Sequence, residues 1–375
     1  MEKSKTKIKL NKKTSLIFNV VNYAITLGVL LAVLLVGRQK FSASFGMLFI
    51  YLGGVIIAGI INALVHEFGH YLAGKRNGFS LYSFCFWFFS FTKDGKKFRF
   101  NFTFLGEESG KTEMIPNTLD NLSERTIKMA RGGLIASFIM MILGVVPIVI
   151  SSYIPLVLYF LTSMFLPIGA YYFFGNALPI LSLGARNDGA TILGLKNGED
   201  DAKVMLSILA ISSELKNGKT PSEIEEKFYF EVPQLQEDNF YFISLLTFRY
   251  NYYLDKGDFK GAKTTIDRLV SLLDYMPQSA KVVVKTMALY ASSTFDFNED
   301  LADDYMSDLE KYLNNLNNAT NIRTKLAYIY YVVKEEDKQI LTDFYQKGIR
   351  EAQKDFIKGE GLFEIKLLEK IKNEF

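Results

Sequence analysis

Four stretches of this 375-residue chain are apolar over enough residues to cross a lipid bilayer, and they restrict the fold more than any other feature. They cover residues 15–37, 44–73, 132–150 and 153–181. A spanning helix needs about 20 apolar residues, and in lipid only helices and closed barrels satisfy their own backbone hydrogen bonds. The sequence therefore predicts a mainly α fold built on a four-span transmembrane helical bundle. No small-residue cleavage site follows the first stretch, so we expect an uncleaved anchor.

Basic residues are concentrated in segments that would lie on one side of the membrane. Residues 1–190 hold 19 Lys and Arg against 9 Asp and Glu, whereas residues 191–375 hold 24 against 31. Six lysines precede the first span and ten basic residues separate the second from the third, but only Arg38 and Lys40 separate the first from the second. Because cytoplasmic loops carry the excess of Lys and Arg, we expect a multi-pass protein of the cell membrane with both termini in the cytoplasm. The acidic second half argues against a nucleic-acid partner.

Both histidines of the chain lie near the end of the second span, in the motif His66-Glu67-Phe68-Gly69-His70. Histidines four residues apart share one helix face and can bind one Zn²⁺. Zinc lowers the pKa of a bound water to about 7, so Glu67 can take a proton from that water. A chance match or two core histidines are the alternatives, but ionisable groups in apolar spans cost about 2.5–3.5 kcal/mol and are functional by default. The motif predicts a zinc site near the cytoplasmic face.

Zinc needs a third protein ligand, and the chain offers no further histidine and a single cysteine, Cys85, for which we expect a packing role. A carboxylate must therefore complete the site. We favour Asp188, because Pro179 ends the fourth span and glycines at 184 and 189 let the chain turn back toward the bundle. Asn187-Asp188-Gly189 could instead be an ordinary cytoplasmic turn. The other candidate ligands are Glu107, Glu108 and Glu113.

On these residues the chain resembles the site-2 protease family of intramembrane zinc metalloproteases. In that family H-E-x-x-H on one transmembrane helix is completed by an aspartate in an N-x-x-P…D-G segment on a later one. The matching residues here are His66, Glu67, His70, Asn176, Pro179, Asp188 and Gly189. The resemblance implies that His66, His70 and Asp188 hold zinc and that Glu67 is the general base. It also implies that Asn176 helps to place the scissile backbone or to stabilise the oxyanion.

The resemblance covers about residues 44–195 and includes one departure. The common family spacing puts the aspartate eight residues after the asparagine, whereas here the separation is twelve. The geometry of Asp188 therefore depends on how the chain between the two residues folds.

The segment between the second and third spans carries a β signal. Residues 97–104 alternate polar and aromatic side chains, which is typical of a half-buried strand, and Asp94-Gly95 favours a hairpin turn. We expect a β-hairpin within residues 79–115 whose phenylalanine face is buried in the bundle or the lipid interface. The resemblance implies a re-entrant element, closed by residues 110–114, whose edge can align an extended substrate. Alternatively, the hairpin only plugs or anchors the bundle.

From about Asn197 the pattern changes to amphipathic helices, and residues 253–262 resemble the central part of a tetratricopeptide repeat. We therefore expect a basic tail with the first anchor at 1–40, a site-2-protease-like zinc peptidase core at 41–195, and a soluble cytoplasmic helical-hairpin domain at 196–375. Such helical surfaces commonly bind a protein partner. The alternative is a compact domain that only stabilises the membrane core.

Two classes of function follow. The first is an intramembrane zinc endopeptidase that hydrolyses peptide bonds in membrane-embedded or signal-peptide-like substrates near the cytoplasmic face, with Glu67 as general base. The second is a non-catalytic membrane scaffold that binds partners through its helical domain. The intact Glu67 favours the enzyme, since a scaffold needs no base beside two histidines. A membrane zincin with glutamate as third ligand is a further enzyme alternative, and Asp188 distinguishes the two enzymes.

Overall fold

The structure is a computed structural model that describes residues 12–40, 45–86, 89–95, 97–102, 110–182, 185–315 and 318–375. The chain divides into two compact units. The N-terminal unit comprises Met1–Thr92, Phe100–Met114 and Asp120–Ala202. The C-terminal unit comprises Lys93–Arg99, Ile115–Leu119 and Lys203–Phe375. Each unit is described by itself below.

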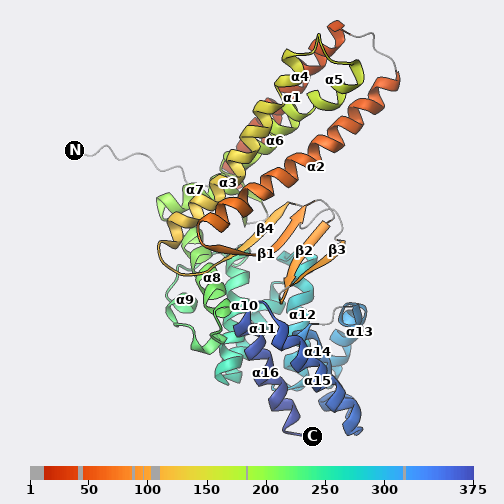
Figure 1. The fold of residues 1–375 in the computed structure, drawn as a ribbon. Coiled ribbons are helices and arrows are strands. Elements are labelled where there is room, and N and C mark those ends of the chain that lie inside the picture. Colours follow the sequence, from red (N-terminus) through yellow and green to blue (C-terminus); the bar gives the residue numbers. More distant parts are fainter. Residues whose placement is uncertain are drawn as a thin grey trace, which may run out of the picture. The chain divides into compact units, whose positions relative to one another are not determined.

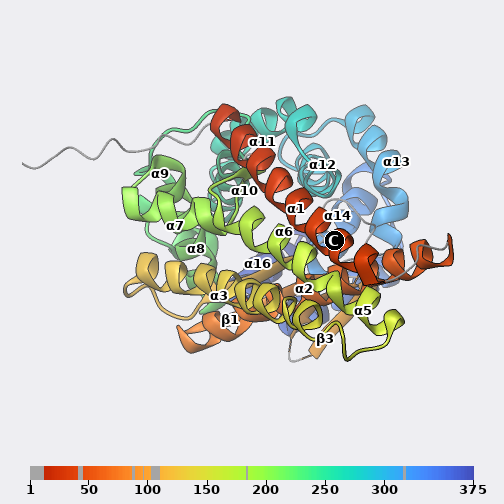
Figure 2. The same cartoon turned by 90° about the horizontal axis from the view of Figure 1, so that it is seen from above.

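Helices dominate the N-terminal unit (Figure 1). They are α1 (Lys12–Lys40), α2 (Phe45–Arg76), α3 (Leu122–Leu143), α4 (Val146–Val149), α5 (Leu156–Ser163), α6 (Phe165–Ala177) and α7 (Asp188–Asn197). Four segments are long and apolar enough to cross a membrane, namely Lys13–Gly37, Phe49–Arg76, Leu122–Val149 and Leu156–Ala177. The predicted mainly helical fold with four spans is confirmed, and helix α6 packs against α1, α2 and α3 (Figure 2).

Two predicted span boundaries are wrong. The third helix begins at Leu122, ten residues before the predicted start, because its polar first turns continue one packed face through the buried residues Leu122, Thr126, Ala130, Gly133 and Ser137. The fourth segment is interrupted at Met164 and resumes as α6, which has Pro167 in its first turn, where a proline without an N–H is tolerated. It ends at Ala177 because Leu178, the residue before Pro179, is extended.

Small residues let α2 and α3 approach each other closely. A Cβ placed on Gly69 would lie 2.5 Å from the carbonyl oxygen of Gly132, and a Cβ on Gly132 would lie 2.4 Å from the carbonyl oxygen of Gly69. Neither position has room for a side chain, so the backbones pack directly, as at other membrane helix interfaces. This close packing brings α3 against the histidine face of α2.

The segment after α2 forms a four-stranded sheet in the order β3-β2-β1-β4. Its strands are β1 (Phe79–Phe86), β2 (Phe89–Asp94), β3 (Lys97–Phe102) and β4 (Lys111–Pro116). Strands β1 and β2 pair antiparallel, and the predicted turn at Asp94-Gly95 separates β2 from β3. The sheet is larger than the predicted hairpin, because β4 adds a strand beside β1 at one edge.

Phe84, Phe86, Phe89 and Phe91 share one face of the sheet, and Ser83, Cys85 and Ser90 lie on the other. The ring of Phe100 lies 5.2 Å from that of Phe91, and these residues face away from Cys85, whose Sγ lies 3.1 Å from the Oγ of Ser90. Cys85 is buried, in agreement with its expected packing role. Phe98 and Phe100 are 46% and 45% exposed, so the described residues do not bury the aromatic face completely. The re-entrant character of the sheet stays a prediction.

The C-terminal unit is built from helices that pack against their neighbours in the chain. They are α8 (Asp200–Lys216), α9 (Lys227–Phe230), α10 (Phe240–Lys256), α11 (Phe259–Ser271), α12 (Gln278–Ser293), α13 (Glu299–Asn315), α14 (Ala319–Ala327), α15 (Lys338–Lys354) and α16 (Lys358–Lys372). The window that resembles a tetratricopeptide repeat forms the turn between α10 and α11. There Gly257 has a φ of 76° and Asp258 caps α11 by accepting a hydrogen bond from Gly261. The helical hairpins agree with the expectation, but a tetratricopeptide fold stays a prediction.

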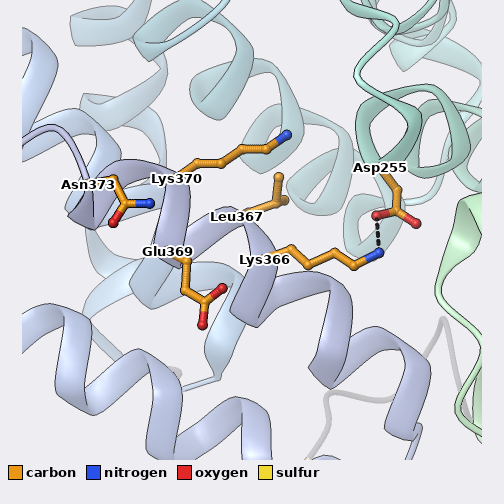
Figure 3. Close-up of a pocket in the computed structure, with 6 residues that line it drawn as sticks. All are labelled: Asp255, Lys366, Leu367, Glu369, Lys370 and Asn373. Atoms are coloured by element: carbon orange, nitrogen blue, oxygen red, sulfur yellow. Dashed lines mark hydrogen bonds and ion pairs between the residues drawn. The ribbon is translucent and has the colours of Figure 1, made fainter.

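Polar contacts also hold the C-terminal unit together. The Nε of Arg323 donates to Glu364 Oε2 at 2.6 Å, both side chains are buried, and the guanidinium lies 3.9 Å from the ring centroid of Tyr290. Elsewhere Lys366 of α16 donates to Asp255 of α10 at 3.1 Å, beside a surface pocket (Figure 3). The pocket is lined by Asp255, Lys366, Leu367, Glu369, Lys370 and Asn373.

Candidate metal centre

The two histidines of α2 and Asp188 of α7 converge on one point. His66 and His70 lie one helical turn apart on the same face, with their Nε2 atoms 3.1 Å apart. The Oδ2 of Asp188 lies 3.4 Å from His66 Nε2 and 3.2 Å from His70 Nε2. Both histidines are buried, and Asp188 is largely so. Among the described residues, this is the group whose donor atoms are arranged to hold a metal ion.

The donor set fits a zinc ion on two grounds. With bonds of about 2.0–2.1 Å, two ligand atoms of a tetrahedral zinc site stand about 3.3 Å apart, close to the three separations here. In addition, the Oδ2 of Asp188 is buried and has no hydrogen-bond partner within the described part of the chain. When both imidazoles are neutral with their protons on Nδ1, these three atoms all present lone pairs, and they repel unless a cation lies between them.

Helix α3 orients both imidazoles through their other ring nitrogens. The Nδ1 of His70 lies 3.0 Å from the carbonyl oxygen of Met129, and that of His66 lies 2.8 Å from the Oγ of the fully buried Ser137. A carbonyl only accepts, so His70 Nδ1 donates its proton and Nε2 keeps a lone pair for the metal. Between them, a Cβ on Gly133 would lie 2.3 Å from His70 Nε2, so glycine is needed there.

A small hairpin explains how Asp188 reaches the site despite the long spacing from Asn176. Strands β5 (Leu181–Ser182) and β6 (Ala185–Arg186) pair with each other, so the chain leaves and returns at the same place. The N–H of Asn187 donates to the carbonyl of Ile180 at 3.2 Å, and the N–H of Ile180 donates to Asn187 Oδ1 at 3.1 Å. Because residues 180 and 187 are hydrogen-bonded neighbours, the extra residues do not move Asp188 away from the end of α6.

Asn187 also fixes the start of α7. Its Oδ1 accepts from the N–H of Ala190 as the helix N-cap, and its Nδ2 donates to the carbonyls of Gly175 and Leu178, each at 2.7 Å. The next glycine is needed because a Cβ on Gly189 would lie 2.3 Å from the carbonyl oxygen of Ala177. The Asn-Asp-Gly segment is therefore a helix N-terminus tied to α6 and not the ordinary turn that was the alternative. Asp188 is its first residue, where a negative charge is favoured.

Arg186 braces the same segment from the other side. Its side chain is 2% exposed, its Nε donates to Asp201 Oδ2 at 2.8 Å, and it also pairs with Glu199. Its Nη1 donates to the carbonyl of Ala190 at 2.6 Å. These contacts join β6, α7 and the first turn of α8. Together with Asn187 they hold Asp188 from both sides of the hairpin.

Glu67 is 5% exposed and follows His66 directly on α2. The Oγ1 of Thr112, on strand β4, donates to Glu67 Oε2 at 2.6 Å. The buried carboxylate therefore has a fixed partner outside its own helix. A carboxylate beside the metal ligands can act as a general base toward a water bound there.

The structure leaves the role of Asn176 a prediction. Its Nδ2 donates at 3.0 Å to the carbonyl of Tyr172, one turn earlier on α6, and the ring centroid of Tyr172 lies 6.4 Å from that of His66. Helix α6 thus passes close to the histidines, but the asparagine side chain bonds within its own helix. Of the rival zinc ligands, Glu113 pairs with Lys111 at 2.5 Å and does not join the metal cluster. Glu107 and Glu108 lie outside the described residues.

Sequence reasoning missed Thr112, Ser137, Asn187 and Arg186. Ser137 had a weak signal, since it lies four residues after Gly133 on the packed face of α3. Asn187 had one as well, because an asparagine before Asp-Gly is a good helix N-cap. Thr112 and Arg186 had none, because their partners lie on other elements or beyond a loop.

Comparison with known proteins agrees with this geometry. The family model for peptidase family M50 matches residues 54–314, which is more than half of the chain. The chain belongs to peptidase family M50. This is the site-2 protease family, so the predicted resemblance is confirmed, and membership supports a metalloprotease in a multi-pass membrane protein. The match extends well beyond the expected 44–195, into the helices of the C-terminal unit. Neither the curated proteins nor the solved structures gave a match.

Proposed function

We propose that this M50 protein is an intramembrane zinc endopeptidase of the site-2 protease type. Its substrates are membrane-embedded or signal-peptide-like segments, hydrolysed near the cytoplasmic face. The observation that carries the proposal is the convergence of His66, His70 and Asp188 within 3.4 Å of one another, beside a buried glutamate on a span-length helix. A scaffold has no use for such a buried cluster of ionisable groups, which is costly in an apolar helix.

The proposed mechanism assigns one task to each side chain. His66, His70 and Asp188 would hold zinc, which when bound supplies Lewis acidity toward the scissile carbonyl and a water with a pKa near 7. Glu67 takes the proton of the attacking water and returns it to the leaving amine nitrogen as the peptide bond breaks. Asn176 is proposed to orient the scissile backbone or to stabilise the oxyanion, in keeping with its place one turn after Tyr172 on α6.

The sheet suggests how the substrate is presented. Strand β4 is at an edge of the sheet, and Thr112 on that strand contacts Glu67. A substrate segment that leaves its helix and pairs with this edge would therefore pass close to the base. Helical peptide bonds are closed to attack because their carbonyls are hydrogen-bonded, so local unwinding must come before cleavage.

The cytoplasmic location rests on charge and helix length. The excess of basic residues between the second and third spans favours the cytoplasm for that segment. His66 lies 21 residues after Phe45 on α2, a rise of about 32 Å, against a hydrocarbon core of about 30 Å. For the C-terminal unit we propose a tetratricopeptide-like role, binding a cytoplasmic protein partner through its helical hairpins.

Zinc content and cleavage test the proposal together. Wild type, Glu67→Ala and Asp188→Ala are purified in detergent, assayed for bound zinc, and incubated with a tagged model transmembrane substrate. We expect Glu67→Ala to keep zinc and lose cleavage, and Asp188→Ala to lose most of its zinc. Asp120→Asn, an exposed aspartate, serves as control. Full cleavage by Glu67→Ala would refute the protease, and undiminished zinc in Asp188→Ala would move the third ligand to another carboxylate.

A further inference from the structure

Thr112 makes a contact with Glu67 to which the proposed mechanism assigns no catalytic role. Its Oγ1 lies 2.6 Å from Glu67 Oε2 and 3.2 Å from the backbone carbonyl oxygen of Glu67. A carboxylate and a carbonyl only accept hydrogen bonds, so the threonine hydroxyl is the donor. It has one hydrogen, and the shorter separation assigns that hydrogen mainly to Oε2.

The two carboxylate oxygens of Glu67 are therefore unequal. Oε2 is held by a hydrogen bond to a charged acceptor, which is among the stronger hydrogen bonds in proteins. No hydrogen-bond donor among the described residues reaches Oε1, and its neighbour is Gly110, where an added Cβ would lie 3.5 Å from Oε1. Gly110 has a φ of 86°, so the chain needs glycine there, and residue 110 places no side chain beside Oε1.

We propose that Thr112 is a positioning residue that holds Glu67 Oε2, so that Oε1 is the oxygen that exchanges the proton with water and with the leaving amine. The inference rests on the proposed peptidase function. With Oε2 fixed, the carboxylate cannot rotate about its terminal torsion to offer the wrong oxygen, and terminal carboxylate torsions are otherwise broad. Since Thr112 belongs to the edge strand β4, the strand proposed to meet the substrate also sets the orientation of the base.

A purely structural role is the competing explanation, because the same hydroxyl also reaches the backbone of α2. The experiment therefore compares Thr112→Val, which keeps the shape and removes the hydroxyl, with Thr112→Ser, which keeps the hydroxyl. Thr126→Val is the matched control, because the buried Thr126 hydroxyl donates only to Leu122 within its own helix. Each full-length variant is measured for kcat, KM, zinc content and melting temperature.

We expect Thr112→Val to lower kcat roughly 10- to 100-fold, the range seen when an outer-shell partner of a metal site is removed, with KM within about twofold of wild type and full zinc. Thr112→Ser should restore most of kcat, and Thr126→Val should leave it unchanged. A wild-type kcat in Thr112→Val would overturn the inference alone. So would a low kcat in both Thr112 variants with a lowered melting temperature. A zinc-loaded wild type that cleaves nothing would overturn the proposed function and this inference with it.

Discussion

At the scale of single residues, the metal centre depends on one missing side chain as much as on the ligands. Gly133 faces the two imidazoles, and a Cβ there would lie 2.3 Å from His70 Nε2 and 2.9 Å from His66 Cε1. Such contacts are far below van der Waals distance, so either the histidines or α3 must move. The absence of a side chain at Gly133 therefore leaves room for the two imidazoles and for the cation that they would bind.

Gly133→Ala should accordingly lose zinc although it replaces glycine by the best helix former. We expect at least a tenfold weaker zinc affinity, measured by competition with a chelator, and loss of cleavage in proportion to the lost zinc. Gly28→Ala on α1 is the matched control, since its added Cβ meets no heavy atom within 4 Å. Equal zinc affinity in Gly133→Ala and wild type would show that α3 does not enclose the ligands as described.

The residues of the site differ in how far sequence alone reveals them. His66, Glu67 and His70 could be identified as site residues from the sequence alone, because their relative positions are set by a single helix. Elimination predicted only a carboxylate as third ligand, since no other histidine and no spare cysteine could complete the site. The choice of Asp188 among the candidate carboxylates rested on the helix break at Pro179, the neighbouring glycines and the family resemblance. Ser137 and Thr112 could not be read, because they meet His66 and Glu67 across sequence separations of 71 and 45 residues that depend on helix and sheet packing.

At the scale of elements, the β5–β6 hairpin shows why residue counts between motifs mislead. Twelve residues separate Asn176 from Asp188, but the hydrogen-bonded pair of Ile180 and Asn187 closes the hairpin between them. The number of residues between two positions predicts the distance between them only when the intervening chain is extended or helical. A closed hairpin adds residues without adding distance between its ends. Similarly, the residue pattern did not identify β4 as a strand, because its six residues lack the alternation that identified β3; only the family resemblance implied that residues 110–114 close the β-element.

Helix α16 supplies a prediction about pH. Burial, together with the neighbouring carboxylates of Asp355 and Glu364, raises the pKa of Glu360 to about 8. The folded state thus retains this proton at pH values where the unfolded chain has released it, so Glu360 costs stability progressively from about pH 4.5 to pH 8. Below that window both states are protonated and the cost vanishes.

Glu360→Gln should therefore stabilise the protein at neutral pH, by about 1–2 kcal/mol at pH 7.5 once partial solvent contact is allowed for. The gain should shrink toward pH 5. Melting temperatures of wild type and variant from pH 5 to 8 measure this, with Glu369→Gln, an exposed glutamate on the same helix, as control. A gain that is equal at pH 5 and pH 7.5 would mean that proton binding to Glu360 is not its cause.

At the scale of the whole molecule, the structure divides into two compact units, the first of which reaches Ala202, and the predicted domain boundaries at residues 40 and 195 stay predictions. The sequence itself predicts two chemically different halves, one basic and apolar and the other acidic. Hydropathy and charge predict this because apolar spans and acidic amphipathic helices need different solvents. The family match from 54 to 314 nevertheless takes in part of the C-terminal unit, which local motifs did not indicate. Amphipathic helices carry no short motif that distinguishes one family from another. Their relationship to a family is therefore detected only when many positions of the whole segment are compared together.

Orientation in the membrane is the remaining whole-molecule prediction, and two exposed tyrosines allow a test. Tyr153, 89% exposed, lies between the third and fourth spans, and Tyr275, 65% exposed, lies in the C-terminal unit. With the N-terminus inside, an odd number of spans precedes Tyr153 and an even number precedes Tyr275. In a Cys85→Ser background, we expect a membrane-impermeant maleimide to label Tyr153→Cys in intact cells and Tyr275→Cys only after permeabilisation. Full labelling of Tyr275→Cys in intact cells would show that the predicted topology is inverted. The proposed cleavage would then take place near the outer face, because the same excess of lysine and arginine predicts the side of the membrane for both Tyr275 and His66.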